Sequence, residues 1–241
     1  MIILYDEKVI ALKARKVGGT SFEIALSRYA NDTSIITPIT LSDEKVRYDL
    51  GFRGPQNFRY SSLREAWHFD KRNLIKAIVK KKLPMKYWNH IRAEDACTKL
   101  GEHIWNSYTK ISIVRNPFDY MVSSYFWGVS EKKRATLSFE NYCLRNPGLL
   151  LRNEKIYEIN GNNVIDFMIR YEHLYDDISA LERKIPELKG LAGTFSKLNA
   201  KGDIRPKSAR TSEMFENAPR SHALISNVCH DAIEKYGFEI P

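Results

Sequence analysis

The sequence of 241 residues contains no internal repeat, no low-complexity segment and no apolar run of the length that crosses a membrane. Such a span needs roughly 18 consecutive apolar residues. The chain also reaches acidic residues at Asp6 and Glu7 before any apolar segment of signal-peptide length develops, and no basic segment comes before them. We therefore expect a soluble, cytoplasmic chain that forms one domain over residues 1–241.

Cysteine is scarce. The three cysteines, Cys97, Cys143 and Cys229, are odd in number and far apart, and none belongs to a Cys-x-x-Cys pair. No histidine accompanies them at the spacing of a metal site, and no pair of histidines with a carboxylate has such spacing either. This pattern favours reduced thiols and excludes a disulfide framework, and we expect no metal.

Negative charge is in deficit. Lys and Arg number 38 against 29 Asp and Glu, which gives a formal net charge of +9 and a pI near 9.3. An excess of this size favours anionic partners such as nucleotide phosphates or acidic glycans. The basic residues are dispersed along the chain and form no stripe, and no named DNA-binding or RNA-binding motif occurs, so a nucleic-acid-binding protein is the weaker interpretation.

Short apolar segments alternate with amphipathic ones. The pattern predicts strands over 9–12, 110–114 and 163–169, each followed by a helix, over 20–26, 117–127 and 171–185. Further helices are predicted over 70–82, 93–100 and 221–236, and the stretch 37–67 is expected to form loops and short helices. Alternation of this kind predicts an α/β fold with a central parallel sheet flanked by helices.

The loop after the first predicted strand has the composition of a phosphate-binding loop. Gly18 and Gly19 allow close approach of the backbone, Thr20 and Ser21 add hydroxyl donors at the start of a helix, and Lys16 adds a cation. Lys16 precedes both glycines, so the loop is not a Walker A motif, in which the lysine follows the second glycine. An ordinary turn with surface cations is the structural alternative.

A second group of residues begins where the strand over 110–114 ends. Arg115 follows that strand directly, in the position where open α/β sheets bind ligands, and its guanidinium can hold a phosphate with two hydrogen bonds. Ser123 lies eight residues later, about two turns along the next helix. The alternative is an arginine that caps the sheet and a serine on an exposed helix face.

These two segments resemble the motifs of sulfotransferases that use PAPS (3′-phosphoadenosine 5′-phosphosulfate). The Lys-Val-Gly-Gly-Thr-Ser-Phe loop is similar to their 5′-phosphosulfate loop, and Val-Arg-Asn-Pro-Phe-Asp-Tyr-Met-Val-Ser-Ser-Tyr is similar to their 3′-phosphate motif. Other matches resemble the carbohydrate branch, which includes the heparan 2-O and chondroitin enzymes: Asn89-His90-Ile-Arg-Ala, Trp105-Asn-Ser-Tyr108, Phe167 to Leu174 and Asp231 to Phe238.

The resemblance implies a P-loop nucleotide-kinase-like three-layer fold and metal-independent transfer of a sulfuryl group from PAPS to a hydroxyl, with PAP as product and a glycan as acceptor. His90 matches the general base, and Lys16 is suited to stabilise the leaving oxygen. His68 and Glu94 are reserve candidates for the base; the four other histidines, at 103, 173, 222 and 230, are expected to be structural. The expected donor-binding residues are Arg15, Lys16, Gly18, Gly19, Thr20, Ser21, Arg115, Ser123 and Arg210.

The sequence departs from the family pattern in three places. Arg15 stands where the family loop usually has proline, the region from Arg205 to Arg210 matches the 3′-phosphate contacts loosely, and residues 37–85 match no family motif. Three alternatives stay open at this point: a P-loop-type nucleotide kinase, a basic nucleic-acid-binding protein, and an inactive binding module on a sulfotransferase scaffold.

Overall fold

A computed structural model of the chain describes residues 1–69, 83–130, 137–198, 205–206 and 208–241. The helix predicted over 70–82 and Lys207 lie outside the described residues.

The centre of the fold is a five-stranded sheet with the order β3-β1-β2-β4-β7. Strands β2, β4 and β7 pair in parallel, and β1 pairs antiparallel with both of its neighbours. This confirms the predicted parallel centre, while the two strands at the β1 edge were not anticipated. The strands are β1 (Ile2–Leu4), β2 (Val9–Ala11), β3 (Ile35–Ile36), β4 (Thr109–Val114) and β7 (Phe167–Arg170).

Strand β4, the central one of the three parallel strands, has the composition of a strand covered on both faces. Its residues from Lys110 to Val114 are all buried, and three of them are β-branched and apolar. The register pairs Ala11 with Ile111 on one side and Val114 with Arg170 on the other, so the carboxyl ends of β2, β4 and β7 meet at one edge. The predicted strand over 163–169 is observed as β7, shifted toward the C-terminus.

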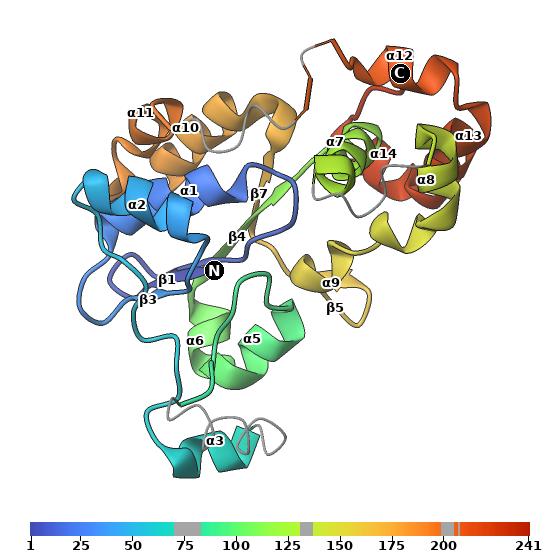
Figure 1. Cartoon of the computed structure of the whole chain (residues 1–241). Helices are drawn as coiled ribbons and strands as arrows, with labels where there is room; N and C mark the ends of the chain where they lie inside the picture. Colours follow the sequence, from blue (N-terminus) through green and yellow to red (C-terminus); the bar gives the residue numbers. More distant parts are fainter. Residues whose placement is uncertain (70–82, 131–136, 199–204, 207) are drawn as a thin grey trace.

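Helices cover both faces of the sheet (Figure 1). On one face lie α1 (Gly19–Leu26), α2 (Leu41–Asp49), α10 (Leu174–Lys184) and α11 (Leu191–Ser196), and on the other α5 (Ala93–Leu100) and α6 (Glu102–Ser107). Helix α3 (Leu63–Phe69) lies farther out, and the short α9 (Glu154–Tyr157) leads into a hairpin of β5 (Glu158–Ile159) and β6 (Asn162–Asn163). The arrangement is the expected three-layer α/β fold.

A second group of helices packs beyond the end of β4 (Figure 1). It consists of α7 (Pro117–Ser130), α8 (Phe139–Arg145), α12 (Thr211–Glu216), α13 (Pro219–Val228) and α14 (His230–Tyr236). These helices bury an apolar cluster of their own in which Phe118 meets Phe215 edge to face, with 5.1 Å between ring centroids. This packing anchors α7 and, with it, the residues that follow Arg115.

Helix boundaries follow the capping residues. Asn116 accepts a hydrogen bond from the backbone N–H of Phe118 through its side chain, which confirms the expected start of α7 at Pro117. Gly237, with φ +64°, ends α14 in the left-handed conformation. The helix predicted over 221–236 is divided in two at Cys229, and the one predicted over 171–185 begins with a 3₁₀ turn before α10. Among the described residues, no helix is long and apolar enough to cross a membrane.

Candidate active site

The loop between β2 and α1 turns sharply at two residues. Lys16 (φ +59°) and Gly18 (φ +70°) both adopt the left-handed conformation, and Gly18 caps α1. A Cβ atom at Gly19 would lie 2.9 Å from Cγ of Lys13, so the loop packs too closely for a side chain there. The glycines therefore hold the backbone in the compact turn that brings the start of α1 toward the sheet edge.

A buried ion pair joins this loop to helix α1. Lys13 donates to Glu23 on α1 at 2.5 Å, and the amino group of Met1 donates to the other oxygen of the same carboxylate. Burial by itself would raise the pKa of Glu23, but these two cations outweigh it and lower the pKa to about 2. Lys13 is thus committed to holding the loop against α1.

Asn153 fixes the backbone of Arg15. Its side-chain oxygen accepts from the N–H of Arg15 at 2.9 Å, and its side-chain nitrogen donates to the carbonyl of Arg15 at 3.1 Å. Two hydrogen bonds from one amide side chain replace the conformational restraint that proline gives at this position in the family loop.

The ammonium of Lys16 lies on an aromatic ring. Its Nζ is 3.3 Å from the centroid of the Trp127 ring on α7. Trp127 lies one helical turn beyond Ser123, and both residues face the same cleft as the loop.

Arg115 is fixed on three sides at the end of β4. Its guanidinium donates to the carbonyl of Lys16 at 2.7 Å and to the Asp119 carboxylate at 2.7 and 2.5 Å, and it lies 3.9 Å from the centroid of the Tyr171 ring. The side chain of Arg115 is 9% exposed. It therefore joins the phosphate-type loop directly to the start of α7.

Asp119 also binds a second arginine, Arg205, and so holds it close to Arg115. Its other oxygen accepts from Arg205 and, at 2.7 Å, from Thr211. Burial would raise the pKa of Asp119, yet the charge of Arg115 and these hydrogen bonds lower it below its ordinary value. Arg210, the residue expected here from the sequence, is 76% exposed and lies 3.8 Å from Glu213.

His90 lies against the loop in a defined tautomer. Its Nδ1 is 2.8 Å from the carbonyl oxygen of Lys13. Since a carbonyl only accepts, Nδ1 carries the proton and Nε2 presents a lone pair. Burial, assisted by the nearby charges of Arg15 and Lys13, lowers the pKa of His90 to about 4. Near neutral pH this imidazole is thus an uncharged proton acceptor.

The other candidate bases do not share this position. Glu94 is exposed on α5 and does not line the cleft. His68 belongs to α3, at a position whose side chain is outside the described part of the structure. His222 packs against Phe118 in the second apolar cluster, as expected of a structural residue. The three remaining histidines, His103, His173 and His230, are exposed.

One cleft of about 1110 Å³ brings the glycine loop, Arg115, Trp127 and His90 together at the carboxyl ends of the parallel strands. Seven cationic residues line it, against two carboxylates, Asp43 and Asp119. Apart from the reserve bases His68 and Glu94, each residue that the sequence analysis selected lines this cleft: Arg15, Lys16, Gly18, Gly19, Thr20, Ser21, His90, Arg115, Ser123 and Arg210. The cleft is built for a ligand with several negative charges, beside a neutral imidazole that can take up a proton.

A family model described as Sulfotransferase family matches residues 1–240. The chain belongs to the sulfotransferase family. Searches of curated proteins and of solved structures found no match. The membership agrees with the sulfotransferase resemblance of the two motifs, and it makes sulfuryl transfer the general chemistry of this chain.

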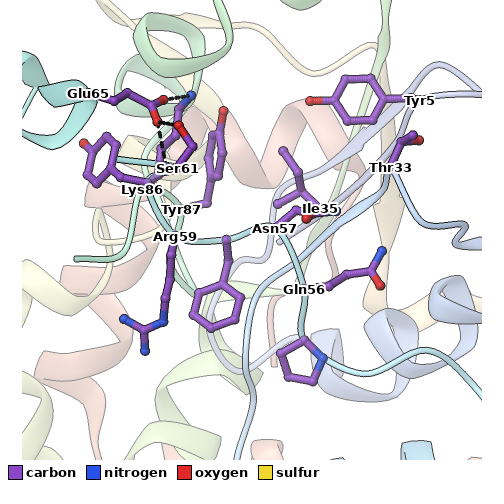
Figure 2. A pocket seen from close by; sticks show the side chains of 13 residues that line it. Tyr5, Thr33, Ile35, Gln56, Asn57, Arg59, Ser61, Glu65, Lys86 and Tyr87 are labelled. Carbon is purple, nitrogen blue, oxygen red and sulfur yellow. Dashed lines mark hydrogen bonds and ion pairs between the residues drawn. The ribbon is translucent and has the colours of Figure 1, made fainter. Parts of the chain in front are cut away.

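A second cavity of this sulfotransferase, about 700 Å³, lies at the opposite edge of the sheet (Figure 2). Tyr5, which follows β1, and Thr33, which precedes β3, mark that edge. In Figure 2 the carboxylate of Glu65 accepts from Lys86 at 2.7 Å and from Ser61 at 2.7 and 2.8 Å. Ser61, Glu65 and Lys86 are bound to one another, and the described residues that line this cavity include neither a glycine nor a histidine.

Sequence reasoning missed four residues in or beside the candidate site: Asp119, Trp127 and Arg152, which line the cleft, and Asn153, which holds Arg15. Asp119 and Trp127 carried a usable signal, because they lie four residues after Arg115 and four after Ser123, one helical turn in each case. Asn153 lies 138 residues from its partner Arg15 and carried none. Within the described residues no group of three or more potential metal ligands occurs.

Proposed function

We propose that this sulfotransferase moves a sulfuryl group from PAPS to a hydroxyl of a carbohydrate. The observation that carries the proposal is the shared cleft: a phosphate-type loop with Lys16, a fixed Arg115 and the unprotonated Nε2 of His90 all open onto one volume. A donor with a phosphosulfate at one end and a phosphate at the other matches this distribution of cations.

The two ends of the donor have separate binding groups in this proposal. The loop from Arg15 to Ser21 holds the 5′-phosphosulfate through backbone N–H groups, hydroxyls and the Lys16 ammonium. Arg115 and Ser123 hold the 3′-phosphate, and Arg205 or Arg210 adds a further cation. Since Asp119 already orients Arg115 and Arg205, little side-chain ordering is needed when the phosphate arrives.

The transfer is an in-line displacement at sulfur. His90 Nε2 takes the proton of the acceptor hydroxyl as its oxygen bonds to sulfur, and the bond from sulfur to the bridging oxygen breaks with its electron pair leaving on PAP. Lys16 stabilises the charge that develops on that oxygen. The proton is then released from His90 to water. No step requires a metal ion.

The acceptor class rests on two supports. The motifs around His90, Trp105, Phe167 and Asp231 resemble the carbohydrate branch of the family, and the net charge of +9 suits an acidic glycan. The acceptor class can be tested by measuring the transfer of label from radiolabelled PAPS to a panel of glycosaminoglycan oligosaccharides, with a phenol and a steroid as controls.

The decisive test is calorimetric titration with PAP, ATP and ADP in the absence of Mg²⁺, followed by titrations with ATP in the presence of Mg²⁺ and with nucleic acid. We expect micromolar binding of PAP alone, weakened by about 100-fold in Arg115→Ala because a charge-assisted, two-bond phosphate contact is lost. Arg59→Ala, in the cavity of Figure 2, is the matched control and should leave PAP binding unchanged. Absence of PAP binding, or a preference for ATP with Mg²⁺, would reject the proposal in favour of a kinase, and binding of duplex or single-stranded nucleic acid without PAP would favour the nucleic-acid alternative.

A further inference from the structure

Two arginines of the cleft differ from Arg115 and Arg205 in their partners. Arg115 and Arg205 both contact the carboxylate of Asp119. Among the described residues, the side chains of Arg15 and Arg152 form no hydrogen bond and no ion pair; only their backbone groups do. No carboxylate of the described residues cancels the charge of these two guanidinium groups, so both can bind an anion from solution.

The backbone brings these two arginines to the same part of the cleft. Asn153, the residue after Arg152, binds the backbone of Arg15 through two hydrogen bonds of 2.9 and 3.1 Å. Both arginines line the cleft, and burial together with the positive charge of Arg152 lowers the pKa of Arg15. Two like charges therefore lie near each other, and an anion bound between them would relieve their repulsion.

This pair of arginines lies beside the proposed base. The Nδ1 atom of His90 is 2.8 Å from the carbonyl oxygen of Lys13, two residues before Arg15. Burial is the main cause of the lowered pKa of His90, and the charge of Arg15 adds to it, so the guanidinium is close enough to act on the imidazole. An acidic group held by Arg15 and Arg152 would thus lie close to the hydroxyl whose proton His90 takes.

We infer that the side chains of Arg15 and Arg152 form an acceptor subsite, which binds a negatively charged group of the acceptor, a carboxylate or a sulfate. This inference rests on the proposed function and deepens it, because it selects acidic acceptors over neutral ones. The backbone of Arg15 belongs to the donor loop, while its guanidinium serves the acceptor. A guanidinium matches either anion with two parallel hydrogen bonds.

Calorimetry on the enzyme loaded with PAP tests the subsite. The probes are hexasaccharides of unsulfated chondroitin, which carries carboxylates, of keratan sulfate, which carries sulfate esters without carboxylates, and of chitin, which is neutral. We expect at least one acidic probe to bind about tenfold more tightly than the neutral one, and its kind identifies carboxylate or sulfate as the bound group. If neither acidic probe binds more tightly than chitohexaose, the inference is rejected.

Substitutions assign this binding to the two arginines. In Arg152→Gln we expect the affinity for the acidic probe to fall about tenfold and the affinity for PAP to change by less than about twofold, because a charge-assisted contact to the acceptor alone is lost. In Arg15→Gln the loss of acceptor affinity should exceed any loss of PAP affinity. Arg92→Gln is the matched control, since Arg92 is an exposed arginine two residues after His90 that does not line the cleft.

The outcomes separate the subsite from the proposed function. An equal loss of acceptor affinity in Arg92→Gln would show a general effect of net charge and overturn the subsite. Weaker PAP binding with unchanged acceptor binding in Arg15→Gln and Arg152→Gln would assign both arginines to the donor and overturn it as well. Absence of PAP binding to the wild type rejects the proposed function and the acceptor role with it, whereas PAP binding with unchanged acceptor affinity in both variants rejects the subsite alone.

Discussion

The cleft around Lys16 and the cavity around Glu65 lie at opposite edges of the same sheet, and they differ in the balance of their charges. The cleft is lined by seven cations and two carboxylates, whereas the cavity of Figure 2 is lined by two cations, Arg59 and Lys86, and one carboxylate. Both are large enough for a ligand. Only the cleft has the charge excess that an anionic donor requires.

The two regions also differ in where their polar groups come from. The cleft gathers residues from the carboxyl ends of β2 and β4, the start of α1 and the loop before α5, and these segments are far apart in the sequence. In the cavity, the ion pair and the serine come from the start of α3, which supplies Glu65 with Ser61 just before it, and from the segment around Lys86 that bonds to it. Convergence of distant segments on one point is typical of a site for a ligand, and local pairing is typical of a support for loops.

Among the substitutions that distinguish the cleft from the cavity, His90→Asn should have the largest effect, and this effect should be on kcat. Asparagine tolerates the φ of +60° found at His90, and its amide can still donate to the Lys13 carbonyl, but it cannot accept a proton. We expect kcat to fall by about 100-fold to 10 000-fold. PAP affinity, measured by calorimetry, should stay near the wild-type value. A variant that retains its kcat would remove His90 from the reaction and leave the base unidentified.

The pH dependence of the wild type sharpens the same point. Because the pKa of His90 is lowered to about 4, the imidazole stays neutral in the free enzyme at all higher pH values. We expect kcat/KM for PAPS to be flat from pH 7 to about 5 and to fall below that. The decrease of kcat should begin at a higher pH, because the negative charge of the bound donor favours the imidazolium form of His90. The free energy of unfolding should also decrease as the pH falls, because protonation of His90 favours the unfolded chain. The contribution of the neutral imidazole to stability is therefore lost between pH 6.5 and 4.

The part of the site that the sequence predicts is the part encoded in contiguous segments. The glycine loop with its flanking strand and helix, and Arg115 at the end of β4, are read from local patterns because strand, turn and helix each have a short-range signature. The His90 position came from the family resemblance, since one histidine in a loop carries no pattern of its own.

The rest depends on contacts that no local pattern encodes. Asn153 reaches Arg15 across 138 residues, and Arg205 reaches Asp119 across 86. Arg205 and Arg210 look equivalent in the sequence, and only the fold of the C-terminal segment brings the first against Asp119. Strands β1 and β3 were missed for another reason: runs of two or three residues are too short to show a period of two, and the equally short β2 was predicted because a glycine turn and a helix follow it.

A medium effect is expected from Asp119→Asn, which tests whether the cleft needs its internal carboxylate. Removal of the charge leaves Arg115 and Arg205 close together without a counter-ion, so we expect the free energy of unfolding at pH 7 to fall by about 2 kcal/mol. The pKa of Asp119 is lowered in the folded state, and its stabilisation is therefore present above the ordinary carboxyl pKa and lost as the pH falls. Urea titrations of the wild type and the variant at pH 7 and pH 3 measure the loss of unfolding free energy and its dependence on pH. Equal losses at the two pH values would show that the charge of Asp119 is not the source of its effect.

The smallest effect is expected from Glu65→Gln in the cavity of Figure 2, and it should be confined to stability. Burial would raise the pKa of Glu65, but hydrogen bonds from Lys86 and Ser61 lower it to about 2. The carboxylate thus stabilises the fold above about pH 4.5 and loses this contribution as the pH falls toward 2. Because the pair is partly exposed, the loss in Glu65→Gln should be about 0.5 to 1 kcal/mol at pH 7 and close to zero at pH 2 to 3. PAP affinity and kcat should match the wild type. A Glu65→Gln enzyme with reduced transfer to a long acceptor, and normal PAP binding, would contradict the assignment of this cavity to structure and make it part of the acceptor site.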